Sequence, residues 1–148
     1  MQNHYITIAP GDLWKIFVQL RIYKGGGNAT SPKMFGPNGP RDSDFDIRLH
    51  ETTRVPWVYP NKTKGLSFAG SISRLERFRI SGVVYEIRSE DLQELPHGLV
   101  IHYRDLDHPL INVAEPMPVV KAICLFSYLG KLMKSTGVKI LPNGKRVG

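Results

Sequence analysis

Residues 61–75 read NKTKGLSFAGSISRL, and this pattern predicts three consecutive elements. Residues 61–65 are typical of a turn, and the apolar residues on either side of Ser67 indicate a short strand. Apolar residues recur at helical spacing across 72–78, and Ser71 stands where it can cap the first amides of that helix. The strand carries one hydroxyl, that of Ser67, which makes this serine the first candidate functional residue.

The composition is that of one folded domain spanning residues 1–148. Hydrophobic residues make up 41% of the chain and charged residues 22%, and this length is close to the commonest domain size. The longest apolar run is interrupted by Lys121, so it is too short to cross a bilayer, and the first ten residues lack the pattern of a cleavable signal peptide. Cys124 is the only cysteine, which excludes an internal disulfide, and we expect it in the core on an apolar helix face.

Before the quoted stretch, the sequence predicts strands joined by a long loop. Residues 13–24 are rich in β-branched and aromatic residues and favour a strand. Residues 25–44 form a Gly/Pro-rich stretch that we expect to hold no regular element, with its first three glycines as a flexible hinge. Residues 45–49 alternate as an edge strand would, and residues 55–59 form an extended piece flanked by prolines, which argues against a central strand.

After the quoted stretch, the sequence predicts three strands and a helix. Residues 83–88, 99–104 and 109–114 alternate apolar and polar side chains, which suggests three antiparallel neighbours. Residues 117–137 predict a helix that has Pro118 in its first turn and stops at Gly137. Strands and helices in this order favour the α+β class.

The residues alone indicate few kinds of catalytic site. Ser67 with His102 or His108 could form the nucleophile and base of a hydrolase, although the G-x-S-x-G elbow of many hydrolases is missing. The histidines lack the H-E-x-x-H spacing of a zinc site, so no metal is expected. Gly25 to Gly27 follow a predicted strand but lack the spacing of a dinucleotide-binding loop.

The net charge is +7, which creates a positive field that attracts anions. Nucleic acid, phosphate-bearing ligands and an acidic protein partner all fit such a field. The sequence contains no helix-turn-helix, zinc-finger or ribonucleoprotein motif that would single out nucleic acid. The charge alone therefore leaves the class of partner open.

Several short segments, taken in chain order, resemble a known family. The family is that of the cytotoxic type VI secretion effectors with an ADP-ribosyltransferase-like fold, together with its fungal relatives. The matching segments are LWK at 13–15, KGLS at 64–67, VVYEI at 83–87, ELPHGL at 94–99, DHPLI at 107–111 and AEPM at 114–117. Each motif is short, and together they cover most of the chain.

The resemblance implies two small antiparallel sheets that flank a cleft for NAD, with few helices. In that fold a basic residue, a hydroxyl and a third polar group hold the dinucleotide and stabilise the positive sugar that forms as nicotinamide leaves. By resemblance these catalytic roles fall to Lys15, Ser67 and His108. Lys15 and Ser67 would also bind NAD, with Ser71 and Tyr85 as lesser candidates.

The resemblance further implies a toxin that acts in the cytoplasm of a target cell. It would transfer ADP-ribose from NAD to an unidentified macromolecular acceptor, or cleave NAD, and an immunity protein would neutralise it. The alternative is a binding module without enzymatic activity, which would engage nucleic acid or a protein through the same cleft or the basic surface.

Overall fold

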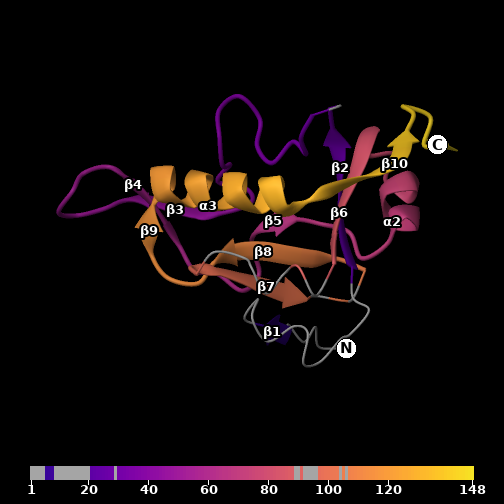
Figure 1. Cartoon of the computed structure of the whole chain (residues 1–148). Helices are drawn as coiled ribbons and strands as arrows, with labels where there is room; N and C mark the ends of the chain where they lie inside the picture. The colour runs from indigo at the N-terminus through magenta and orange to yellow at the C-terminus, as the bar shows by residue number, and fades with distance from the viewer. Residues whose placement is uncertain are drawn as a thin grey trace.

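The chain is an α+β protein, as the sequence predicted (Figure 1). The structure is a computed structural model, and it describes residues 6–8, 21–28, 30–88, 91, 97–103, 105 and 107–148. In these ranges it contains three small antiparallel sheets and two helices, so the expectation of two sheets was wrong. Neither of these helices is long and apolar enough to cross a membrane.

The first sheet has the strand order β1-β7-β8-β5, the second β11-β10-β6-β2 and the third β3-β4-β9. The first consists of β1 (Ile6–Ile8), β7 (Leu99–Tyr103), β8 (Pro109–Val113) and β5 (Leu66–Ser67). The second consists of β11 (Arg146–Val147), β10 (Lys134–Ile140), β6 (Gly82–Arg88) and β2 (Arg21–Gly27). The third consists of β3 (Asp46–Leu49), β4 (Pro56–Tyr59) and β9 (Met117–Pro118), and the helices are α2 (Ile72–Arg77) and α3 (Val119–Leu132).

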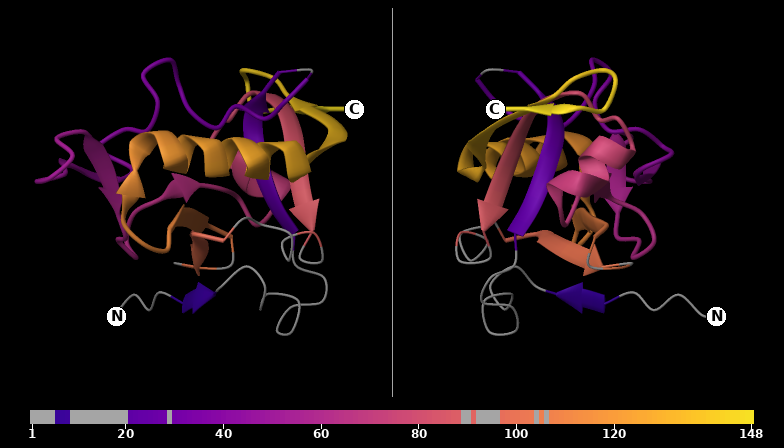
Figure 2. Two further views of the ribbon diagram at one scale, coloured as in Figure 1. Left: turned by 60° about the vertical axis from the view of Figure 1, so that its left-hand side comes forward. Right: turned by 90° about the vertical axis from the view of Figure 1, so that its right-hand side faces the viewer.

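The long helix α3 connects the three sheets in space. Figure 1 shows the third sheet near its amino end, the second sheet beyond its carboxyl end, and β7 and β8 below it; the views in Figure 2 agree. α3 buries Phe126 and Leu129 completely, and both pack in one core cluster with residues of all three sheets. The apolar stripe of this helix therefore supplies the common core.

Three aromatic rings tie α3 to the segment that precedes β3. Phe126 lies edge-to-face against Phe35, with ring centroids 5.3 Å apart, and against Phe45, with centroids 5.8 Å apart. Phe35 and Phe45 complete the triangle at 6.0 Å. Edge-to-face pairs add to the free energy gained by burial, so this cluster fixes the position of the irregular segment 30–45.

The glycines at the start of the predicted loop belong instead to a strand. β2 runs to Gly27 and pairs with β6, with a shift of register between Lys24 and Gly27. A Cβ atom on Gly27 would come within 2.6 Å of the Tyr85 ring. Glycine is therefore required here by a close approach at a bulge, which the sequence analysis took for a flexible hinge. Residues 30–45 do lack a regular element, as predicted.

The predicted helix over 117–137 was too long at both ends. α3 begins at Val119 and ends at Leu132, and Gly137 lies inside β10. The hydroxyl of Thr136 donates a hydrogen bond to the carbonyl oxygen of Val84, so this polar segment gains its partners from β6. Cys124 is exposed, which contradicts the prediction that it lies in the core.

Two predictions of strand order were also wrong. The prolines that flank residues 55–59 argued against a central strand, but β4 is the middle strand of the third sheet. It can hold this place because β9 pairs with Trp57 and Val58 and not with Pro56, which has no amide hydrogen to donate. β6 does not neighbour β7; it lies between β10 and β2 in another sheet. Alternation of side chains indicates a strand but does not name its partner. β7 and β8 are antiparallel neighbours, and β3 is an edge strand, as predicted.

Candidate functional site

The side chains of Ser67 and His108 meet at the end of the first sheet. His108 Nε2 lies 3.3 Å from Ser67 Oγ, within hydrogen-bonding distance. Ser67 is exposed at the end of β5, and His108 is half-buried just before β8. The two residues line a cavity of about 180 Å³, named here the Ser67 pocket, whose other lining residues are Ser43, Asp44, Thr63, Lys64, Gly65 and Leu110.

Contacts between β5 and β8 explain why these two side chains meet. Ser67 pairs with Leu110 in the ladder, and the amide of the next residue, Phe68, donates to the carbonyl oxygen of Pro109. Gly65 approaches β8 so closely that a Cβ atom there would lie 2.8 Å from the carbonyl oxygen of Ile111. The glycine before the serine is therefore a packing requirement that lets a two-residue strand join this sheet.

Asn112 holds the turn that leads into the Ser67 pocket. Its side chain is fully buried on β8, and Nδ2 donates to the carbonyl oxygens of Asn61 and Lys64 at 3.2 and 3.0 Å. A buried amide is costly unless it is bonded, so these contacts fix turn 61–64 against the sheet. The sequence alone does not single out Asn112, since a polar residue on an alternating strand is ordinarily expected to face solvent.

A second cavity lies beside β5 and contains Lys24. Lys24 Nζ donates to the carbonyl oxygen of Ser67 at 3.0 Å and lies 5.4 Å from the centre of the Phe68 ring. This Lys24 cavity measures about 250 Å³, and it is lined also by Lys33, Met34, Phe35, Gly36, Gly39, Arg41, Asp44 and Leu66. Asp44 lines both this cavity and the Ser67 pocket. Lys24 is thus a cation in direct contact with Ser67, and the sequence alone did not indicate it.

Burial lowers the pKa of Lys24 from 10.5 to about 8. Desolvation is the largest cause, the nearby Asp44 carboxylate opposes it, and the positive charge of Arg41 adds to it. Arg41 donates from Nε to Asp44 Oδ2 at 2.9 Å, so the same carboxylate serves two cations. The site therefore holds an amine whose charge is sensitive to pH and to bound anions.

The free energy of unfolding should rise with pH because of Lys24. Between pH 8 and 10.5 the unfolded chain holds the Lys24 proton while the folded chain has released it, so the unfolded state binds more protons and stability increases with pH. We expect the difference in free energy of unfolding between wild type and Lys24→Met to change in favour of wild type across this range. Urea unfolding at pH values on either side of the range measures it. A constant difference would contradict the assigned burial of the amine.

Ser71 is engaged in a network that fixes the turn before His108. Its hydroxyl donates to Asp107 Oδ1 at 2.6 Å and accepts from the amide of Arg74 at 3.2 Å. Arg77 donates to the same carboxylate at 3.2 Å. The predicted helix cap is confirmed, and both bonds direct the hydroxyl to these partners.

Replacing Ser71 by alanine should lower the free energy of unfolding by about 1–2 kcal/mol, because both the cap and the bond to Asp107 are lost. Chemical denaturation measures the loss. Ser73 is exposed on the same helix, and its replacement by alanine should change stability by less than about 0.5 kcal/mol. Equal effects of the two substitutions would contradict the role of Ser71 as a cap.

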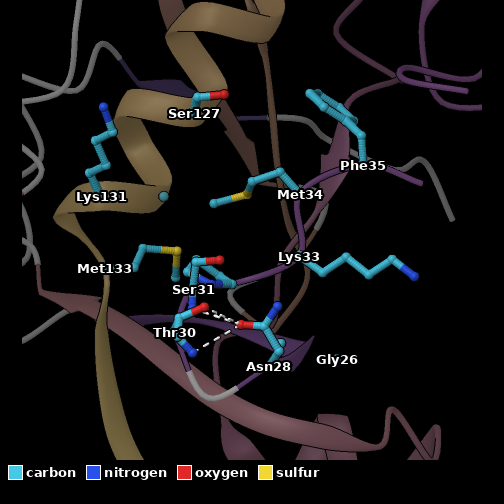
Figure 3. Close-up of a pocket in the computed structure, with 13 residues that line it drawn as sticks. Gly26, Asn28, Thr30, Ser31, Lys33, Met34, Phe35, Ser127, Lys131 and Met133 are labelled. Carbon is cyan, nitrogen blue, oxygen red and sulfur yellow. Dashed lines mark hydrogen bonds between the residues drawn. The ribbon is translucent and has the colours of Figure 1, made fainter. Parts of the chain in front are cut away.

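A larger cavity lies between α3 and the segment after β2 (Figure 3). Its volume is about 940 Å³, and polar side chains such as Asn28, Ser127 and Lys131 mix with Met34 and Met133 along its walls. In Figure 3, Lys33 extends away from the centre of this cavity. Lys33, Met34 and Phe35 also line the Lys24 cavity, so one segment separates the two.

Tyr85 supports the wall of this large cavity and does not line the Ser67 pocket. Its ring is buried against Gly27, and its hydroxyl donates to the carbonyl oxygen of Asn28 at 2.6 Å. Gly27 and Asn28 both line the large cavity. The expectation that Tyr85 shares a site with Ser67 is therefore not met by the geometry.

Of the five predicted site residues, the structure brings two together: Ser67 and His108. Ser71 is bound in the Asp107 network and Tyr85 lies under the large cavity. Lys15 lies outside the described residues. Of the two histidines considered for a hydrolase, His108 is the one beside Ser67. His102 is buried on β7, where it pairs with Leu110, and burial lowers its pKa.

The arrangement can bind an anion and move a proton. A neutral imidazole at Nε2 can accept a proton from a hydroxyl or from an attacking nucleophile at the Ser67 pocket. Lys24, Lys33 and Arg41 supply positive charge to the adjoining cavity, and Asp44 is the one carboxylate among the described residues that line it. Among the described residues, no three His, Cys, Asp or Glu side chains gather as metal ligands would.

Comparisons of the chain with models of protein families, with curated proteins and with solved structures find no match. The resemblance to type VI effectors remains a prediction from short motifs. The geometry around Ser67 and His108 is therefore the main guide to function.

Proposed function

We propose that the protein is an ADP-ribosyltransferase-like toxin that uses NAD, either transferring ADP-ribose to a macromolecule or cleaving NAD. The observation that carries the proposal is the 3.3 Å contact between His108 Nε2 and Ser67 Oγ at the wall of one cavity. The resemblance had assigned both residues to the same site although 41 positions separate them in sequence. The finer likeness to the ADP-ribosyltransferase fold is part of this proposal.

Charge and space around the pair support a nucleotide as the ligand. The Lys24 cavity adjoins the Ser67 pocket at Asp44 and is lined by three cations, which suits the diphosphate of NAD. A ribose held in the Ser67 pocket would lie beside the Ser67 hydroxyl, which can bond to the sugar. In this assignment Lys24 takes the part that the resemblance gave to Lys15.

The chemistry requires a bond to break and a proton to leave. The bond between ribose C1 and the nicotinamide nitrogen breaks, and its electron pair stays on the leaving nicotinamide. As this bond breaks, an acceptor hydroxyl, amine or water adds to C1 and releases a proton, which His108 Nε2 is placed to accept. Exclusion of water and fixed dipoles would favour the positively charged sugar.

Incubating the purified protein with cell extract and NAD labelled in its adenosine half tests the proposal. Transfer of label to protein or nucleic acid, or its appearance as free ADP-ribose, is expected. Folded protein that leaves the labelled NAD unchanged would argue for a binding module without activity. In the proposed setting the toxin acts in the cytoplasm of a target cell, and an immunity protein that blocks the Ser67 pocket would prevent both outcomes.

The Ser67–His108 contact also favours a second candidate, a serine hydrolase in which His108 activates the Ser67 hydroxyl. A fluorophosphonate reagent distinguishes the two. Covalent labelling of Ser67 that is lost in His108→Ala, while Ser73 stays unlabelled, would favour the hydrolase. Release of nicotinamide without labelling of Ser67 would favour the NAD reaction.

A further inference from the structure

Lys24 differs from an ordinary surface lysine in its surroundings. Its side chain is half-buried, its ammonium is held by the carbonyl oxygen of Ser67, and the Phe68 ring lies beside it. Yet it also lines the Lys24 cavity, so a small molecule in that cavity would reach it. An amine that is desolvated and still accessible is the setting in which lysines act as nucleophiles.

The lining of the cavity specifies what else a ligand should carry. Lys33 and Arg41 provide positive charge, and Met34, Phe35 and Leu66 provide an apolar wall. Arg41 already donates to Asp44 Oδ2 through Nε and Nη2 but keeps further N–H groups. A volume of 250 Å³ corresponds to roughly eight water molecules at about 30 Å³ each, which suits a small phosphorylated molecule.

We propose that the Lys24 cavity binds phosphate-bearing aldehydes and that Lys24 Nζ condenses with them to form an imine. The lone pair of the neutral amine attacks the carbonyl carbon, both amine protons leave with the carbonyl oxygen as one molecule of water, and a C=N bond remains. Lys33 and Arg41 hold the phosphate. The reaction needs no oxidant or reductant.

The protonation of Lys24 supports this reactivity. With a pKa of about 8, roughly one Lys24 amine in ten is neutral at neutral pH, against roughly one in 2,500 for a lysine with a pKa near 10.4. Asp44 opposes the shift, while Arg41 and the loss of water favour it. Lys33 lines the same cavity.

The product of the proposed NAD reaction belongs to this ligand class. ADP-ribose in its ring-opened form carries an aldehyde and a diphosphate, so Lys24 would be an acceptor within the protein itself. Only this role of Lys24 as an acceptor of ADP-ribose rests on the proposed function. The imine site itself does not depend on the NAD reaction, because an aldehyde can be supplied directly.

The test uses pyridoxal 5′-phosphate at limiting concentration, borohydride to reduce the imine to a stable amine, and peptide mapping by mass spectrometry. Wild type should be labelled at Lys24 at least about tenfold faster than at any other lysine. Pyridoxal, which lacks the phosphate, should lose most of this preference. Lys24→Arg keeps the charge and should lose the label, and Lys121→Arg, a charge-conserving change at an exposed lysine of α3 that does not line the cavity, should retain it.

If Lys24 only satisfies the Ser67 carbonyl, burial should protect it, and the exposed lysines should be labelled first; that result would overturn the proposal. The wild-type site distribution decides this even if a variant fails to fold. A second experiment, with ADP-ribose and cyanoborohydride, tests separately whether ADP-ribose itself becomes attached to Lys24. Attachment at Lys24 would support ADP-ribose as a ligand of the Lys24 cavity without any NAD cleavage. Its absence, with pyridoxal phosphate still attached at Lys24, would exclude ADP-ribose as a ligand of this cavity.

Discussion

Replacing His108 by alanine is expected to reduce the release of nicotinamide from NAD by about 100-fold to 10,000-fold, the range that a positioned general base contributes. His108 Nε2 lies 3.3 Å from Ser67 Oγ, and both residues line the same pocket. In the proposed reaction, removing the imidazole would leave the attacking group without an acceptor for its proton. Chromatography of the products of wild type and His108→Ala measures the ratio of rates.

The matched control for this substitution is His97→Ala. His97 is exposed in the turn before β7, so its loss should leave both the rate and the fold unchanged. Circular dichroism of both variants separates a lost base from a lost structure. A His108→Ala protein that is folded and as fast as wild type would remove His108 from the mechanism.

Replacing Phe126 by alanine should lower the free energy of unfolding by about 3–5 kcal/mol, which is typical for a large aromatic residue in a core. Phe126 is completely buried and packs against Phe35 and Phe45. The substitution removes two edge-to-face contacts and leaves a void at the point where α3 meets the irregular segment. Urea unfolding of both proteins measures the loss.

Val120→Ala is the control on the same helix. Val120 is 71% exposed, so this change should cost less than about 0.5 kcal/mol. Because Phe35 also lines the Lys24 cavity, Phe126→Ala should in addition lower the preference of pyridoxal phosphate for Lys24. A Phe126→Ala protein as stable as Val120→Ala would mean that the aromatic cluster does not fix this segment.

Local chemistry made parts of the fold predictable. Ser71 stands before apolar residues at helical spacing, and this pattern predicted the cap of α2. The alternation of apolar and polar side chains predicted β7 and β8 as neighbouring strands. The sequence did not reveal that Gly27 is a strand residue, because the reason is the Tyr85 ring on another strand. The start of β10 was taken for helix because its partners on β6 are distant in sequence. Tertiary contacts thus override local preference at these positions.

The sequence likewise predicted some residues of the candidate site and not others. Motif resemblance paired Ser67 with His108, and the structure brings their side chains together. Lys24 and Asn112 escaped notice because each lies on a strand where a polar residue would ordinarily face solvent. Their importance depends on a buried amine and a buried amide that only the packed sheets create. Ser71, which the resemblance placed at NAD, instead bonds to Asp107.

The central claim is that the Ser67 hydroxyl and the His108 imidazole act together on NAD. The most direct measurement is nicotinamide release by wild type, Ser67→Ala and Ser73→Ala under identical conditions. We predict release by wild type and Ser73→Ala, and a rate at least about tenfold lower for Ser67→Ala because a positioned donor is lost. Equal rates for the two serine variants, or no release by the folded wild-type protein, would contradict the claim.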